Sequence, residues 1–157
     1  MAFHDDLLQQ SLQLVHNEPK KPKQASLRRA VSTAYYALFH FLIGEAVANW
    51  KNQTVRSNLA RAFDHGQMKS ASNRMVSSNL TGQDASVVDG LKLVARAFIT
   101  LQEKRLTADY DSGTFWSRTE ALSQVKLAEQ AFAAWRVIRQ EQIAQAYLVS
   151  LLVKPRG

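Results

Sequence analysis

The sequence contains no cysteine, which excludes a disulfide framework and a thiolate metal site. Zinc would need histidine and carboxylate ligands, but the four histidines show no metal-ligand spacing: His4, His16, His40 and His65. No apolar run approaches the roughly 18–20 residues that span a membrane, and the acidic, polar N-terminus does not resemble a signal peptide. These absences favour a cytoplasmic protein with no metal, no cofactor and no membrane partner.

Proline is scarce, and two of the three prolines lie in the segment 17–23, which is expected to be a polar linker. A first short helix is expected over 5–16, and the main bundle over 24–153. No segment alternates with the period of a strand, whereas apolar residues recur at steps of three and four. The sequence therefore predicts a single all-α domain over 1–157, an antiparallel bundle of about five helices.

Two long helices of this bundle are expected over 24–50 and 54–77, with Gly66 as a possible bend in the second. Asp84 is expected to cap a further helix, and residues 110–116 to form a turn. Ser117 and Glu120 form a capping-box pattern, which predicts the start of the last helix, extending to about Leu152.

The charge balance is basic. There are 20 lysines and arginines against 13 acidic residues, which gives a net charge of +7. Such a surplus favours RNA or another polyanion through electrostatic steering and counterion release. The alternative interpretation is a solvated, mildly basic surface.

Basic and aromatic residues alternate along the helix predicted over 24–50. Arg29, Tyr36 and His40 fall on one face, and Arg28 lies on the adjacent stripe. This pattern can bind phosphates and stack bases, so these four residues are candidates for RNA binding. The alternative is that the tyrosines pack in the core or in a dimer interface.

Two further pairs with helical spacing are candidates for catalysis. Arg61 and His65 are four residues apart, which would let a guanidinium hold a phosphate beside an imidazole that moves a proton. Arg105 and Asp109 continue the inner apolar stripe of their helix, so they form either a buried structural ion pair or the floor of a site. No glycine-rich phosphate loop, GxSxG or HExxH motif occurs.

Four strings together resemble the HEPN (higher eukaryotes and prokaryotes nucleotide-binding) family: LRRAVSTAYYALFHFL (27–42), RAFDHG (61–66), LQEKRLTADYD (101–111) and AEQAFAAW (128–135). The resemblance covers nearly the whole chain in order. It implies an all-α bundle that dimerises. It also implies roles in RNA cleavage, in toxin–antitoxin pairs or phage defence, or alongside a minimal nucleotidyltransferase.

The ribonucleases of this family carry an arginine, then four to six intervening residues, then a histidine, all before the last helix. Arg105 matches that arginine, whereas Asp109 stands near the histidine position. Aspartate does not supply an imidazolium to a leaving oxygen. Either His65 or His40 reaches the pocket, or the protein binds without cutting.

Two functions therefore remain open. The first is a metal-independent ribonuclease of toxin or defence type that uses Arg105, Arg61 and His65. The second is a non-catalytic homodimeric module that binds RNA, a nucleotide or a nucleotidyltransferase-like partner. Tyr110, beside the motif, is a possible target for nucleotide transfer by such a partner, or else packs against Trp116.

Overall fold

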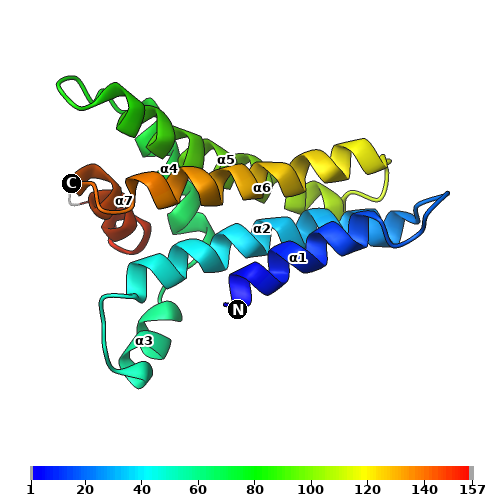
Figure 1. The fold of residues 1–157 in the computed structure, drawn as a ribbon, viewed down its shortest axis with the longest axis horizontal. Helices are drawn as coiled ribbons and strands as arrows, with labels where there is room; N and C mark the ends of the chain where they lie inside the picture. The colour runs from blue at the N-terminus through cyan, green and yellow to red at the C-terminus, as the bar shows by residue number, and fades with distance from the viewer. Residues whose placement is uncertain (1, 156–157) are drawn as a thin grey trace.

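A computed structural model describes residues 2–155, and no strand occurs within them. The all-α prediction is confirmed, but the described part of the chain forms seven helices rather than about five (Figure 1). They are α1 (Phe3–Val15), α2 (Gln24–Val47), α3 (Gln53–Ala60), α4 (His65–Ser77), α5 (Ala85–Tyr110), α6 (Arg118–Ile138) and α7 (Gln142–Leu152).

Helices α1, α2, α5 and α6 form the main body, with α2 packed against the other three. α2 turns back along α1 after the linker, and α6 turns back along α5 (Figure 1). α4 and α7 pack against each other at one end, where α4 also contacts α5. The buried side chains form one core, and the largest of them include Trp135, Tyr35, Tyr147, Phe41 and Phe98.

The helix predicted over 54–77 is in fact two helices. The chain breaks at 61–64 because the Asp64 carboxylate accepts a hydrogen bond from the Gln67 amide, at 2.8 Å, and so caps a new helix. Asn52 caps α3, because its side chain accepts a hydrogen bond from the Val55 amide. Gly66 lies in the first turn of α4 and not at a bend.

The last predicted helix is also divided, at residues 139–141. Arg139 ends α6 and donates hydrogen bonds to the Glu45 carboxylate on α2, at 3.0 and 3.2 Å. The following segment, α7, then packs on α4 instead of continuing along the bundle.

The predicted helix starts at Asp84 and Ser117 are confirmed. Asp84 accepts hydrogen bonds from the amides of Ser86 and Val87. Ser117 and Glu120 form the complete capping box. The first helix and the linker lie within two residues of their predicted bounds.

The expectation that no segment is long and apolar enough to cross a membrane needs correction. α2 reaches that threshold by length and composition, with a mean hydropathy of 1.2 over its most apolar window. However, 67% of that window is buried inside the bundle. A central core helix meets the same criterion, so the composition of α2 is only weak evidence for a membrane span.

Candidate functional site

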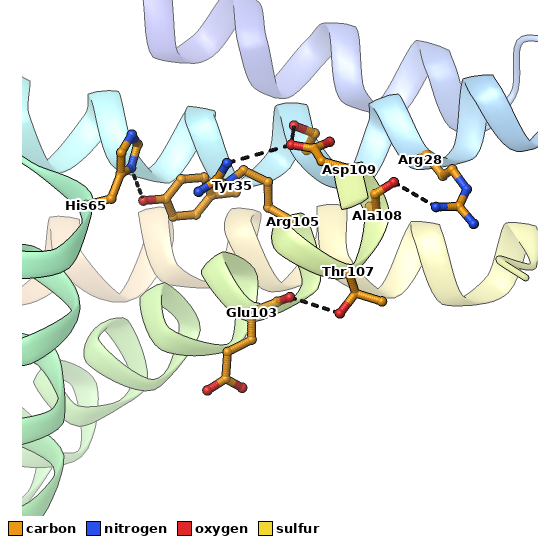
Figure 2. A network of polar contacts seen from close by, with 9 residues as sticks. Arg28, Tyr35, His65, Glu103, Arg105, Thr107, Ala108 and Asp109 are labelled. Carbon is orange, nitrogen blue, oxygen red and sulfur yellow. Dashed lines mark hydrogen bonds and ion pairs between the residues drawn. The ribbon is translucent and has the colours of Figure 1, made fainter. Parts of the chain in front are cut away.

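A group of polar and aromatic side chains lies where α2, α4 and α5 meet. His65, the first residue of α4, contacts the hydroxyl of Tyr35 on α2, with 2.6 Å between Nδ1 and Oη. Arg105 on α5 lies over the same tyrosine ring, 5.1 Å from its centroid. These side chains and Asp109 form a row along α2 (Figure 2). The break before α4 therefore brings an imidazole close to a buried guanidinium.

Arg105 is only 8% exposed and has few polar partners. Its Nη1 lies 3.7 Å from Oδ2 of Asp109, beyond the range of a good hydrogen bond. Within residues 2–155, its Nε has no hydrogen-bond partner. A guanidinium carries five donors, and a buried donor without a partner is unfavourable. The two Nη atoms are not among the fully buried polar atoms and make no hydrogen bond within the described residues, so they can donate to an anionic ligand.

Asp109 lies at the end of this row opposite His65. Its side chain is 30% exposed, and Oδ2 also accepts a hydrogen bond from the Ser32 hydroxyl at 3.3 Å. Arg105 and Asp109 thus form the ion pair that their spacing predicted, with a buried cation and a carboxylate that reaches solvent. The pair lies at the edge of the candidate site.

His65 is half-buried and stacks on Phe39, with ring centroids 4.3 Å apart. Burial lowers the pKa of His65 below 6.5, and the nearby charge of Arg105 lowers it further, against the opposing effect of Asp64. The imidazole is therefore neutral at pH 7. A neutral imidazole can accept a proton, which is the requirement for a general base.

The contact with Tyr35 uses only Nδ1 of His65, so Nε2 remains able to contact a substrate. When Nδ1 carries the proton, it donates to the Tyr35 oxygen and Nε2 is an acceptor; in the other tautomer, Tyr35 donates to Nδ1. Burial raises the pKa of Tyr35 well above its usual range, so the hydroxyl keeps its proton. Tyr35 therefore orients the ring in either tautomer.

The other predicted site residues lie apart from this group. Arg61 is exposed at the end of α3, so it does not share a helix face with His65 as the predicted long helix required. Arg29 is exposed, and His40 is half-buried beside Phe3, with ring centroids 4.9 Å apart. Of the two histidines considered, His65 is the one that lies beside Arg105.

Tyr36 and Arg28 flank the row. The Tyr36 ring lies 5.6 Å from the Arg105 guanidinium. Arg28 donates to the backbone oxygens of Ala108 and Asp111, at 2.9 and 2.8 Å, and to that of Thr114. It therefore fixes the end of α5, and its role as a free phosphate ligand is not supported.

Tyr35, Ser32 and Phe39 were not singled out from the sequence as site residues. They share the stripe that contains Arg28, and the pattern favoured packing in the core or in a dimer interface for its aromatic residues. The contact of Tyr35 with His65 depends on where α4 begins, which periodicity did not reveal. Tyr110, proposed as a modification target, is 76% exposed.

Within residues 2–155 there is no group of three or more histidine and carboxylate side chains placed to hold a metal ion. Comparison with protein-family models, curated proteins and solved structures found no match to this chain.

Proposed function

We propose that this protein is a HEPN-like, RNA-binding protein of toxin–antitoxin or defence type, and that it cleaves RNA without a metal. The observation that supports this best is the position of His65, oriented by Tyr35 beside the buried Arg105. Arg105 would bind the phosphate at the cleavage site, because its guanidinium has unused donors in a low-dielectric setting.

In the proposed reaction, Nε2 of His65 accepts the proton of the ribose 2′-hydroxyl, and the 2′-oxygen attacks the adjacent phosphorus. The bond from phosphorus to the 5′-oxygen breaks, and that oxygen leaves with a proton from water. The products are a 2′,3′-cyclic phosphate and a 5′-hydroxyl. Arg105 offsets the negative charge that develops on the phosphoryl oxygens.

The test is cleavage of labelled RNA in the presence of a chelator. The His65→Ala variant should lower the rate about 10²–10⁴-fold, the usual contribution of a general base. The acidic limb of the rate profile should lie below pH 6.5, because the neutral form of His65 persists there. Arg61→Ala, on the separate α3 end, should keep the wild-type rate.

The alternative is a non-catalytic accessory module with a nucleotidyltransferase-like partner. Two observations favour it: Asp109 stands near the position of the family's histidine, and Tyr110 is exposed enough to receive a nucleotide. RNA binding without cleavage, together with a mass increase of one nucleotide at Tyr110 after incubation with the partner and ATP, would favour this function over the ribonuclease.

The ribonuclease function requires binding to RNA, and the charge of +7 predicts that this binding depends on salt. Affinity should fall steeply as salt rises, because each neutralised phosphate releases counterions. Binding that is absent at low salt would exclude the ribonuclease and leave only an accessory module that binds a protein partner. A cytoplasmic location and a homodimer are parts of the same proposal.

A further inference from the structure

A cleft of about 510 Å³ opens beside the candidate site, at the C-terminal end of α5. Asp109 lines this cleft and also faces Arg105 through Oδ2, so the cleft and the site share a wall. The remaining lining comes from the end of α5, the start of α2 and the loop that follows α5. The volume falls in the range of pockets that hold small organic ligands.

The loop that forms one side of the cleft is fixed to α2. Arg28 donates to two backbone oxygens of the loop, those of Asp111 and Thr114, and to that of Ala108 in the last turn of α5. The side-chain amide of Gln24 makes two hydrogen bonds to the backbone of Trp116. Its Nε2 donates to the Trp116 oxygen at 2.8 Å, and its Oε1 accepts from the Trp116 nitrogen at 2.9 Å. Phe115 lies between these two anchored residues, so its backbone is held in place.

Two aromatic rings are exposed at this fixed cleft. Tyr110 and Phe115 are each 76% exposed, more than any other aromatic residue in the described part of the chain. Trp116, next to Phe115, is buried, so the loop needs only one of its two aromatic residues for packing. A rigid loop that presents flat rings to solvent is suited to stack a planar ligand with little loss of conformational entropy.

The charges of the cleft favour a base over a phosphate. Among the residues that line it, the charged side chains are Arg28 and Asp109. The Arg28 guanidinium is committed to backbone oxygens. Among the described residues, no hydrogen bond ends on the Oδ1 atom of Asp109, and a carboxylate oxygen accepts hydrogen bonds from the amino groups of bases.

We propose that this cleft binds an unpaired base of single-stranded RNA, stacked on Phe115 and Tyr110, while the phosphate of a neighbouring nucleotide lies at Arg105. The proposal rests on the proposed RNA-binding function and adds the substrate class. Bases in an RNA duplex are already stacked on one another, so only an unpaired base can enter. The Asp109 carboxylate would then select bases with an amino group over uracil.

The test is fluorescence anisotropy with a short, labelled, single-stranded oligoribonucleotide and the blunt duplex of the same sequence. Both carry 2′-O-methyl riboses, which block attack by the 2′-oxygen. Phe115→Ala and Tyr110→Ala should each weaken single-strand binding roughly 5- to 150-fold, the effect of removing one stacking ring. Duplex binding should not change.

Three controls separate stacking from loss of structure. Phe115→Tyr and Tyr110→Phe retain a ring and should bind as the wild type does. Phe3→Ala removes an exposed ring on α1, beside His40 and away from the cleft, and should also leave binding unchanged. The melting temperature of Phe115→Ala should match the wild type, because the ring is mostly exposed. A 2-aminopurine in the strand should lose its protein-dependent quenching in Phe115→Ala.

Wild-type affinity in both alanine variants would overturn the base-binding cleft. If Arg105→Gln weakens binding in the same assay while the aromatic variants do not, the RNA-binding function stands and the cleft inference alone is wrong. If the wild-type protein binds neither RNA, both are wrong. Equal binding of poly(U) and poly(C) strands would remove the selective role of Asp109.

Discussion

Arg105 places a positive charge on the inner face of α5, where the preceding turns contribute Phe98 and Leu101 to the core. Tyr35 and Tyr36 cover the flat guanidinium, and Asp109 is its ion-pair partner. A buried cation without a partner is strongly unfavourable, so the carboxylate must contribute to stability even where it reaches solvent. The pair therefore cannot be assigned to catalysis alone.

Replacement of Asp109 by alanine should lower the free energy of unfolding by about 1–3 kcal/mol, because a buried guanidinium loses its ion-pair partner. The loss is smaller than for a fully buried pair, since water reaches the partly exposed carboxylate site. Urea denaturation measures it. Lys104→Ala, one turn away and exposed, is the matched control and should unfold as the wild type does. Equal stability of the two variants would show that the pair is not structural.

The sequence predicted this pair correctly because i,i+4 spacing on a regular helix fixes which side chains meet. It could not decide how His65 would be placed. That position depends on a helix break and on the packing of α4 against α5, and neither follows from local spacing. The i,i+4 argument that paired His65 with Arg61 was wrong for the same reason, because the intervening residues are not helical.

At the scale of helices, the Glu45 carboxylate joins α2 to the end of α6. It accepts a hydrogen bond from the buried Trp135 indole at 2.6 Å and two from Arg139. Glu45→Ala should lower the free energy of unfolding by about 1–3 kcal/mol, because the indole N–H is left buried without a partner. Glu45→Gln keeps an amide oxygen for Trp135 and should lose less. Chemical denaturation of both variants distinguishes the hydrogen bond from the charge.

If the two variants are equally destabilised, the charge on Glu45 matters more than its hydrogen bond to Trp135.

The sequence predicted helix starts better than helix ends. Periodicity and capping patterns identified the starts at Asp84 and Ser117, since a cap depends on residues within one turn. At the end of α6, the side chain of Arg139 binds Glu45, a partner 94 residues away in the chain, and no local pattern contains such a contact.

At the scale of the whole molecule, three histidines make folding depend on pH. Burial is the largest cause that lowers the pKa of His4, His40 and His65 below 6.5. The unfolded chain binds protons at these positions more readily than the folded one. Their contribution to stability is therefore fully present above pH 6.5 and is lost as pH falls through the lower folded-state values.

Urea denaturation should accordingly show lower stability at pH 5 than at pH 7.5. Carboxylates do not explain a loss in this window, because the perturbed ones have pKa values below their usual 3.8–4.5. His40→Gln should reduce the dependence on pH, whereas His16→Gln, at the exposed end of α1, should keep it. A stability that rises on acidification would contradict the assignment.

The molecule should also form a homodimer through the apolar groove between the end of α2 and α7. Trp50 and Val149 line this groove and are 52% and 61% exposed. Sedimentation at tens of micromolar, the order of magnitude at which weak association is populated, should show dimers. Val149→Lys should give monomers. Val137→Lys, a similar change on α6, should not, and monomers throughout the wild-type range would exclude the dimer.

α4 carries His65, and it lies between α5 and α7. Gln67 donates to the backbone oxygen of Ser150 at 3.1 Å, and Ser72 bonds the buried Tyr147 hydroxyl at 2.8 Å. Each transient opening of α7 therefore removes one of the two supports of α4. A ligand that binds only while α7 is packed on α4 makes this packed state more stable, so α7 opens less often. RNA bound at His65 should therefore slow amide hydrogen exchange in α7, although the RNA does not contact α7.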